Sequence, residues 1–418
     1  MHEFSFRDSE FYCEDIKVAD IASRVDTPFY LYSYATLIDH YKKLKTAFKP
    51  INPLISFSMK SNSNLAVIRA LVRSGAGLDV VSGGELYRAR LAGVNPKKVV
   101  YAGVGKKPDE IRDAINFGIL FFNVESEDEL DEIQRVAGKL NKKVNIAVRI
   151  NPDVISKTHR YIATGKGETK FGLDFDTVHK IFNMRWKYPN LNLSGVHVHV
   201  GSQILDANPF ENAIKKILGF LKTRRIEVEY FNIGGGLGII YSIENPQTAK
   251  SFANKVMPLL KASGLKIILE PGRFISGNSG ILVTRVIYTK RTPRKKFVIV
   301  DSGMSDLIRP SLYEAYHKIV PVRVAENSSE TCEKVDIVGP ICESGDFLGR
   351  DRLLPQVCKG DLLAVMGAGA YGFTMSSNYN ARPRPAEVMV IEKKFYIVRK
   401  HETYKDLVKG ETIPEVLR

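Results

Sequence analysis

The sequence predicts two domains, a (β/α)8 barrel (TIM barrel) and a smaller domain built of β-strands. Its 418 residues are more than one ordinary hydrophobic core holds. Residues 35–280 alternate short apolar runs with amphipathic helical segments, and eight such units over roughly 250 residues match the size of a TIM barrel. After residue 280 the helical periodicity fades and strand-like runs follow one another, as in an all-β domain.

The eight barrel strands are expected at short apolar runs. In chain order these runs read PLISFS, LDVVS, KVVYAG, ILFFNVE, VNIAVRI, LSGVHVHV, VEYFNI and LKIILE. Periodic helical segments separate them, and one of these, SEDELDEIQRVAGKL, starts with a serine cap and an acidic first turn. A doubly wound open sheet is the alternative. The eight units, and the lack of a G-x-G-x-x-G fingerprint after the first strand, favour the barrel.

The second domain is expected to combine both ends of the chain. Its strand-like runs are ILVTRVIYTK, KKFVIVD, IVPVRVA, KVDIVG, DLLAVMGAG and VMVIEKKFYIVRK. Near the N-terminus, TPFYLYS is also strand-like and is expected to join them. We therefore expect an N-terminal segment at 1–34 that joins the β domain, the barrel at 35–280, and a β-rich C-terminal domain at 281–418.

Composition narrows the class of protein. The net charge is +15, but the basic residues are scattered apart from RTPRKK at 291–296, which disfavours a nucleic-acid binder. No apolar run reaches the ~18 residues of a membrane helix, and the polar, acidic start shows no signal peptide. Four cysteines show neither metal-ligand spacing nor the density of a disulfide framework. We expect a cytoplasmic enzyme without nucleic-acid or membrane partners.

Polar, charged or glycine residues stand at the ends of six of the eight predicted strands. The catalytic groups of a TIM barrel gather at this end of the strands. These positions are Lys60 after the first strand, Asp79 and the SGGE segment 82–85 after the second, Arg149 after the fifth, HVHVGSQ at 197–203 after the sixth, GGGLG at 234–238 after the seventh and EPGR at 270–273 after the eighth. A lysine at a strand end is ordinarily exposed to solvent and has no special role. Lys60 is a candidate functional residue because the other polar strand ends are expected at the same end of the barrel.

The histidines of HVHVGSQ are candidates for the barrel interior. If the alternating valines face the surrounding helices, His197 and His199 face inward. Two such histidines could bind a metal, but the other six histidines of the chain lie away from the strand ends, so we expect no metal site. A core histidine satisfied by hydrogen bonds is the ordinary alternative, and it suits His197 better than His199, which lies nearer the rim.

The glycines and the acid of the last two strand ends suggest a ligand. GGGLG either makes a tight turn or, with Ser202 and EPGR, forms a backbone cradle for a phosphate. Glu270 ends an apolar run and needs a cationic partner, either an arginine or a protonated heteroaromatic nitrogen. An amine, a ring-flanking histidine, a phosphate cradle and a buried carboxylate together meet the needs of pyridoxal 5'-phosphate.

Longer motifs carry a family resemblance. The sequence resembles the barrel-type pyridoxal phosphate decarboxylases, and among them those that act on diaminopimelate. The resemblance covers nearly the whole chain and rests on TPFYLYS, GGGLGI, EPGR, MSDLIRPSLY, GPICESGDFLG and GAYGFTMSSNYNARPRPAEV. One departure is local: Phe57 and Ser58 stand where the family usually has Tyr-Ala before the lysine, and Ser61 replaces the alanine after it.

The resemblance implies roles in cofactor binding. Lys60 would hold the cofactor covalently, His199 would stack on its ring, and Glu270 would meet its ring nitrogen. Supporting positions around the lysine and the ring would be Asp79, Glu85 and Arg149. The phosphate end would be held by Ser202, Gly235, Gly236, Pro271, Gly272, Arg273 and Tyr371.

The resemblance also implies roles in the β domain. Cys342 of CESGD could be an ordinary buried small residue. By resemblance it would instead give a proton to the carbon that loses CO2, across the interface of a homodimer with shared active sites. Glu343 would bind the distal ammonium group of the substrate. The distal carboxylate would be bound by Arg273, Arg309 and Tyr313, with Tyr371 also at the substrate.

The two arginines favour one substrate. Ornithine, lysine and arginine have no carboxylate at the far end and would leave buried arginines unpaired, which is costly. We therefore expect meso-2,6-diaminopimelate to be converted to L-lysine and CO2, the last step of lysine biosynthesis. The alternatives are an ornithine, arginine or carboxynorspermidine decarboxylase of the same fold and, more distantly, a racemase or a pyridoxal phosphate-binding protein. TGKGETKFG at 164–172 is expected to be a mobile active-site loop.

Overall fold

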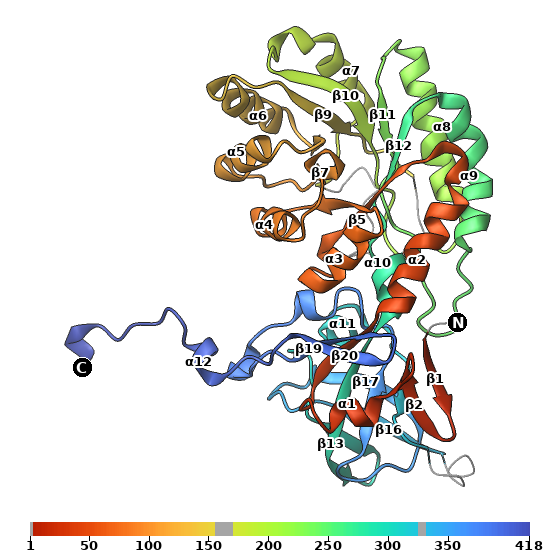
Figure 1. The fold of residues 1–418 in the computed structure, drawn as a ribbon, viewed down its shortest axis with the longest axis vertical. Helices are drawn as coiled ribbons and strands as arrows, with labels where there is room; N and C mark the ends of the chain where they lie inside the picture. The colour runs from red at the N-terminus through yellow and green to blue at the C-terminus, as the bar shows by residue number, and fades with distance from the viewer. Residues whose placement is uncertain (1–2, 155–169, 325–331) are drawn as a thin grey trace. The chain divides into compact units, whose positions relative to one another are not determined.

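The computed structural model divides the chain into two units (Figure 1). The structure describes residues 3–154, 170–324 and 332–418. The barrel unit consists of Leu37–Ser276, and the β unit of Met1–Thr36 together with Gly277–Arg418. The predicted fold class, a TIM barrel plus a β domain that takes in the N-terminal segment, is confirmed. Most of the predicted loop at 164–172 lies outside the described residues.

Eight parallel strands close the barrel in the order β10-β11-β12-β5-β6-β7-β8-β9. Their bounds are β5 (Leu54–Ser58), β6 (Gly77–Val80), β7 (Val99–Tyr101), β8 (Phe121–Val124), β9 (Val144–Arg149), β10 (Leu191–His197), β11 (Tyr230–Asn232) and β12 (Lys266–Leu269). Each lies within or overlaps one predicted apolar run. Pairing of β12 with β5 closes the ring, so the carboxyl ends of all eight strands meet at one rim.

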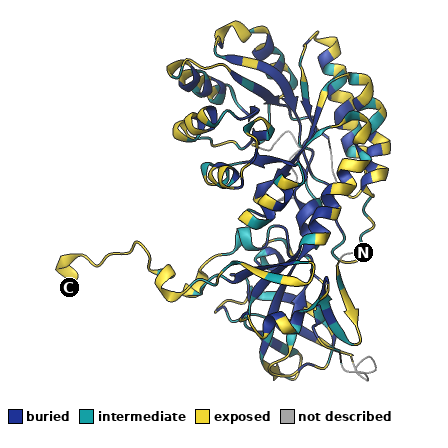
Figure 2. Cartoon of the chain, in the orientation of Figure 1, coloured by how far each residue is buried: buried dark blue, intermediate teal, exposed yellow. Residues whose placement is uncertain are grey.

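Helices surround the barrel strands. They are α2 (Tyr34–Ala47), α3 (Leu65–Arg73), α4 (Gly83–Leu91), α5 (Pro108–Phe117), α6 (Glu127–Lys139), α7 (Phe175–Asn183), α8 (Asn208–Thr223), α9 (Ala249–Ser263) and α10 (Arg273–Ser276). Figure 2 shows exposed residues on their outer faces and buried residues toward the strands. The predicted serine cap of α6 is present, because the Ser126 side chain accepts a hydrogen bond from the Glu129 N–H.

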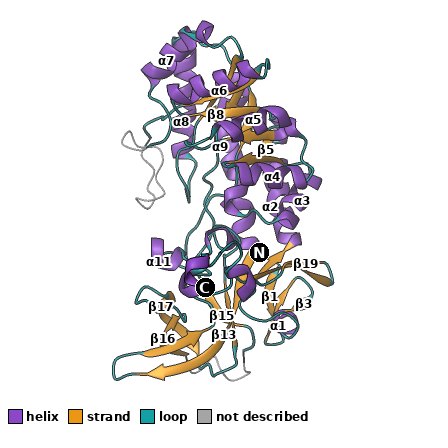
Figure 3. Cartoon of the chain, turned by 90° about the vertical axis from the view of Figure 1, so that its left-hand side faces the viewer, coloured by secondary structure: helices purple, strands orange, loops and turns teal. Residues whose placement is uncertain are grey.

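The described residues of the β unit form two sheets, whose strands stand out in Figure 3. The small sheet has β1 (Phe4–Arg7), β2 (Glu10–Cys13) and β3 (Ile16–Lys17), followed by α1 (Val18–Ala22). The large sheet has β4 (Phe29–Ser33), β13 (Gly280–Arg291), β14 (Lys296–Val300), β15 (Ile319–Pro321), β16 (Cys332–Val338), β17 (Phe347–Pro355), β18 (Leu362–Val365), β19 (Ala386–Ile391) and β20 (Lys394–Arg399). The short helices α11 (Arg309–Tyr313) and α12 (Tyr404–Leu407) complete it.

The TPFYLYS segment forms β4, which lies between β13 and β19 and pairs with both. Phe29 and Leu31 on this strand pack into the core of the β unit against Ile281, Val283 and Val388. The N-terminal segment therefore belongs to the β unit because its apolar side chains supply part of that core. Among the described residues, no helix is both long and apolar enough to cross a membrane.

Candidate active site

The predicted strand-end residues of the barrel unit lie at one rim. Lys60 is in the short 3-10 helix η2 (Met59–Ser61), directly after β5, and its side chain is exposed. Ser58 on β5 is in register with Asp79 on β6. His197 on β10 is in register with Arg149 on β9. Because parallel strands run in one direction, these side chains project from neighbouring strand ends, where barrel enzymes place their chemistry.

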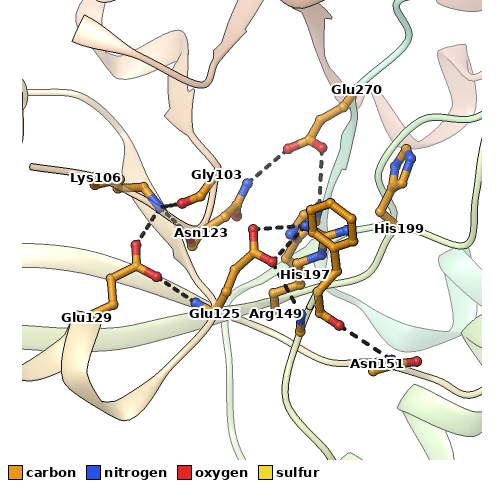
Figure 4. A network of polar contacts seen from close by, with 12 residues as sticks. Gly103, Lys106, Asn123, Glu125, Glu129, Arg149, Asn151, His197, His199 and Glu270 are labelled. Atoms are coloured by element: carbon orange, nitrogen blue, oxygen red, sulfur yellow. Dashed lines mark hydrogen bonds and ion pairs between the residues drawn. The ribbon is translucent and has the colours of Figure 1, made fainter. Parts of the chain in front are cut away.

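Glu270, directly after β12, is buried among three polar side chains, two of which, Asn123 and His197, are shown in Figure 4. Its Oε1 accepts hydrogen bonds from the amides of Asn123, at 3.0 Å, and Asn232, at 2.5 Å. Its Oε2 lies 3.2 Å from Nε2 of His197. Burial by itself would raise the pKa of Glu270, but the charge interaction with His197 and the hydrogen bonds from His197 and Asn232 lower it to about 2. Glu270 is therefore an ionised carboxylate held by a histidine and two asparagines rather than by an arginine.

Sequence reasoning missed Asn123 and Asn232. They stand near the ends of β8 and β11, in the runs FFNV and YFN. The available signal was a polar amide in an otherwise apolar or aromatic strand, because such a residue has to find a hydrogen-bond partner when it is buried. His197 was expected to face inward, with a core histidine satisfied by hydrogen bonds as the ordinary alternative. Its contact with Glu270 stabilises the ionised acid.

Asn123 is fixed in turn by a buried lysine. Nζ of Lys106 donates hydrogen bonds to the carbonyl oxygens of Asn123, at 2.8 Å, and Gly103, at 2.7 Å. The same ammonium lies 2.5 Å from Oε1 of Glu129, and the two side chains are only 1% and 8% exposed. This buried ion pair, at the start of α6 and the loop after β7, holds the backbone that carries Asn123 (Figure 4).

His199 is neutral. Its Nδ1 accepts a hydrogen bond from the Gly235 N–H at 3.3 Å, which requires that nitrogen to be unprotonated. Burial and the positive charges of Lys60 and Arg149 lower the pKa of His199 well below the usual value. An uncharged imidazole at this rim offers a flat apolar face, which suits the stacking role predicted from the sequence.

The glycines of the predicted phosphate cradle allow close packing of strand ends. An added Cβ on Gly235 would lie 2.0 Å from the carbonyl oxygen of Glu270, and one on Gly236, whose φ is +114°, would lie 2.3 Å from that of Gly201. The turn therefore needs glycine whether or not an anion binds. Beside it, the guanidinium group of Arg273 donates hydrogen bonds to Ser202 Oγ, at 3.1 Å, and to Tyr241 OH, at 2.6 Å.

Burial raises the pKa of both supporting acids near Lys60, Asp79 and Glu85. Asp79 accepts a hydrogen bond from the Ser58 hydroxyl, and burial together with the negative charge of Glu270 raises its pKa well above the usual value. Burial also raises the pKa of Glu85 to about 7, although its carboxylate accepts a hydrogen bond from the Val81 N–H at 2.8 Å. Glu85, with a pKa of about 7, therefore exchanges a proton more readily near neutral pH than an exposed carboxylate does.

Arg149 is engaged in a buried ion pair. Its Nη1 lies 2.8 Å and 2.9 Å from the two carboxylate oxygens of Glu125, and its guanidinium carbon lies 4.8 Å from the ring centre of Phe171. Glu125 also accepts a hydrogen bond from the Gly172 N–H at 3.2 Å. Glu125, at the end of strand run ILFFNVE, was not predicted as a site residue. The Arg149–Glu125 pair thus connects the ends of β8 and β9 with the segment that precedes α7.

The remaining predicted site residues belong to the β unit. Arg309 starts α11 and is buried, and its Nε donates a hydrogen bond to Nε2 of His317 at 3.2 Å. Nδ1 of His317 in turn lies 2.8 Å from the carbonyl oxygen of Met366, so this histidine carries its proton on Nδ1. The ring of Tyr313 lies 5.9 Å from the guanidinium carbon of Arg309. Tyr371 adopts a left-handed backbone with φ of +56°.

The CESGD segment exposes its first residues. Cys342 is exposed, so the alternative of an ordinary buried cysteine is wrong. Its backbone N–H donates to Asn380 Oδ1 at 2.8 Å, and the carboxylate of Glu343 accepts a hydrogen bond from Tyr379 OH at 2.8 Å. The thiol and the carboxylate are thus presented at the surface of the β unit on an anchored backbone.

The donor set of the barrel unit fits pyridoxal 5'-phosphate. The ionised Glu270 suits a protonated ring nitrogen, the neutral His199 suits a ring face, and the amine of Lys60 is accessible. No group of three or more His, Cys, Asp or Glu residues in the described ranges is arranged to hold a metal ion.

The barrel, the strand-end lysine and the ionised acid together fit a pyridoxal phosphate-dependent enzyme. Residues 34–277 match the family model "Pyridoxal-dependent decarboxylase, pyridoxal binding domain". Diaminopimelate decarboxylase of Aquifex aeolicus is 46% identical over 407 residues, which is 96% of each chain. The structure of diaminopimelate decarboxylase from M. jannaschii in complex with L-lysine has a TM-score of 0.94 at 38% identity and covers 99% of both chains. The corresponding Helicobacter pylori structure with L-lysine has a TM-score of 0.89 at 39% identity, covering 94% of this chain and 98% of that one.

The chain belongs to the diaminopimelate decarboxylase family. The family predicted from the sequence motifs is confirmed, and with it the pyridoxal cofactor.

Proposed function

We propose that the chain decarboxylates meso-2,6-diaminopimelate to L-lysine and CO2, the last step of lysine biosynthesis. The observation that carries the proposal is identity of 46% to a diaminopimelate decarboxylase over nearly the full length, so that the likeness includes the β unit as well as the barrel. The presence of L-lysine in two related structures fits the product of this reaction.

Residues of the barrel unit would hold the cofactor. Pyridoxal 5'-phosphate supplies an electron sink for the bond that breaks when CO2 leaves. The amine of Lys60 would bind it covalently, and the ionised Glu270 would keep a proton on the ring nitrogen by charge attraction. The neutral ring of His199 would cover one face without adding a competing positive charge.

The phosphate end would lie at the glycine turn. Backbone N–H groups there, together with the Ser202 hydroxyl and the N-terminus of the turn that leads into Arg273, are donors suited to a dianion. The residues we assign to this end are Ser202, Gly235, Gly236, Pro271, Gly272, Arg273 and Tyr371. Asp79 and Arg149 would support the ring from neighbouring strands.

Residues of the β unit would select the substrate. Arg309 is held by His317 along its Nε edge, which orients the planar guanidinium for a carboxylate. With Arg273, Tyr313 and Tyr371 it would bind the distal carboxylate, and Glu343 would bind the distal ammonium group. Diaminopimelate carries both groups at its far end, whereas ornithine and arginine lack the carboxylate and would leave the arginines unpaired.

Cys342 would deliver the proton that replaces the carboxyl group, in the active site of a partner subunit. The exposure of Cys342 and Glu343 supports this role, because a residue that serves a second copy has to lie on the surface. We therefore propose a homodimer with two shared sites. All four cysteines are free, which is compatible with a reducing cytoplasm.

The proposal is tested by measuring CO2 release with added pyridoxal phosphate from meso-diaminopimelate, ornithine and arginine. A strong preference for diaminopimelate supports the activity and the carboxylate-binding roles of Arg273 and Arg309. Turnover of ornithine or arginine instead would overturn the roles of Arg309 and Glu343. Absence of release from all three would contradict a decarboxylase.

A further inference from the structure

The last residues of the chain, 403–418, form an exposed segment of the β unit, which we name the tail. Figure 2 shows nearly all of it as exposed, up to the C-terminus. Within the described part of the chain, the hydrogen bonds of the tail join residues of the tail to one another. The tail therefore adds no hydrogen bond to the rest of the β unit.

The tail has local structure of its own. The N–H and the hydroxyl of Thr403 both donate hydrogen bonds to Asp406 Oδ2, each at 2.8 Å, and this contact fixes the start of α12. A 3-10 turn, Glu415–Leu417, follows Pro414 near the end of the chain. The tail's own sequence therefore sets which of its side chains share a face.

The large apolar side chains of the tail fall into two groups. Each group has the i, i+3, i+4 spacing that places side chains on one face of a helical turn. A protein surface ordinarily carries large apolar residues singly, and a concentration of them marks an interaction site. The first group is Tyr404, Leu407 and Val408, and the second is Ile413, Val416 and Leu417. Tyr404 is 78% exposed and Val416 is 90% exposed.

The residue before the tail, Glu402, is firmly held by the loop at 378–384. Its Oε2 accepts hydrogen bonds from the side-chain amide of Asn378, at 2.7 Å, and from the N–H of Arg384, at 2.9 Å. Its Oε1 accepts another from Nε of Arg384 at 2.6 Å. Several hydrogen bonds to one carboxylate fix the point at which the tail leaves the β unit.

The same loop holds the two residues that are proposed above to act in a partner subunit. The Tyr379 hydroxyl donates to the carboxylate of Glu343, and Asn380 Oδ1 accepts a hydrogen bond from the N–H of Cys342, both at 2.8 Å. Tyr379 is the direct neighbour of the residue that holds the start of the tail. The surface that would face the partner is therefore continuous with the origin of the tail.

We propose that the tail is a dimer arm, which places its two apolar groups on the surface of a second copy of this chain. The inference rests on the proposed function, because the shared active site supplies that second copy. Cys342 and Glu343 would reach into the partner's site, and the tail leaves the same surface, so it meets the same partner. In a symmetric dimer each copy gives one arm and receives one. Contact with the partner removes from water the apolar groups that one chain leaves exposed.

Analytical ultracentrifugation of the holoenzyme tests the arm. One variant combines Tyr404→Ser with Val408→Ser and so removes most of the first apolar group. The matched control combines Lys405→Ser with Lys409→Ser, which are exposed side chains of the same turns. We expect the dimer dissociation constant to rise at least about tenfold in the apolar variant and less than about twofold in the control. Equal dissociation constants for the apolar variant and wild type would overturn the inference.

Photo-cross-linking identifies what the tail contacts. With benzoylphenylalanine in place of Val416, irradiation should give a product of twice the chain's mass on a denaturing gel. Cross-links confined to one chain would show that the tail folds back on its own copy. A dimer that forms no cross-link would show that the tail binds nothing. Either result contradicts the arm.

Activity separates this inference from the proposed function. In the variant that combines Tyr404→Ser with Val408→Ser, specific activity should fall on dilution and return at high protein concentration, because shared sites need the dimer. If wild type releases no CO2 from diaminopimelate, the proposed function is wrong, while sedimentation and cross-linking still decide the arm. If wild type is active as a monomer, the shared site and the arm are both wrong.

Discussion

Asn123 and Glu270 form the contact that best shows how single residues set the electrostatics of the rim. The Asn123 amide lies 3.0 Å from Glu270 Oε1 and gives that carboxylate a donor without adding charge. Asn123→Asp would replace the donor by a second carboxylate at nearly the same place. Like charges at this distance raise a pKa, so Glu270 should take up a proton at higher pH than in wild type.

The Asn123→Asp enzyme should therefore lose activity on the acid side first. We expect the acid limb of kcat against pH to move upward and cofactor affinity at pH 6 to fall by about tenfold or more. Both quantities can be measured by CO2 release and by cofactor titration between pH 5 and 9. An acid limb at the wild-type position would show that Asn123 does not control Glu270.

Glu85 provides a second pH-dependent test. Its raised pKa, about 7, means that the folded protein binds a proton that the unfolded chain releases near pH 4.5. Folded stability is thus penalised progressively as pH rises from about 4.5 to 7, by up to about 3 kcal/mol. Glu85→Gln keeps an acceptor for the Val81 N–H and removes the charge. In cofactor-free protein it should raise Tm more at pH 8 than at pH 5, and an equal effect at both would contradict the assigned pKa.

Single functional residues could be predicted from the sequence where a charged side chain interrupts or ends an apolar segment. Lys60 and Glu270 stand out because charged groups end apolar runs. Asn123 and Asn232 were missed, because an amide within an aromatic strand indicates a buried hydrogen bond but does not identify its partner. The pairing of Lys106 with Glu129 joins residues 23 positions apart, and nothing in the sequence shows that this lysine is buried.

The elements were predictable where their pattern is local. All eight barrel strands and the cap of α6 were found from apolar runs and a serine before an acidic turn. The nine-residue strand β17, Phe347–Pro355, was missed. Its sequence, FLGRDRLLP, carries three charges and no regular alternation. It is a strand because it pairs with β16, at one end of the sheet order, and such pairing is a tertiary contact.

The loop after β7 and the start of α6 depend on one buried ion pair. Lys106→Ala leaves Glu129 as a buried charge without its partner, which should lower the free energy of unfolding by about 3–5 kcal/mol. Lys43→Ala, which removes an exposed i,i+4 pair with Asp39, should cost less than about 0.5 kcal/mol. Urea denaturation of both variants measures the difference. Similar losses in the two would show that the Lys106 pair is not a structural anchor.

For the whole molecule, the fold class followed from alternation of strands and helices, but the sheet order of the β unit did not. Placing β4 between β13 and β19 joins residues near 30, 280 and 390. Period-two patterns identify strands without naming their partners. For the same reason, the substrate residues of the β unit were found only through family resemblance, and their roles stay predictions.

The shared-site homodimer makes a prediction at this scale. If Cys342 serves the partner's site, Lys60→Ala and Cys342→Ala subunits are each inactive alone, but a mixed dimer contains one complete site. Refolding or co-expressing equal amounts should restore up to about a quarter of wild-type activity, since half the dimers are mixed and each has one of two sites. Activity no greater than the sum of the separate variants would contradict shared sites.

The central claim is that Lys60 holds the cofactor, and covalent mapping tests it most directly. The holoenzyme would be reduced with borohydride, digested and analysed by mass spectrometry for a phosphopyridoxyl group. The label is predicted on the peptide that contains Lys60, at that lysine alone, and should be lost in Lys60→Ala. A label on a different lysine, such as the buried Lys106, or no label on the active holoenzyme, would contradict the assignment of the strand-end lysine.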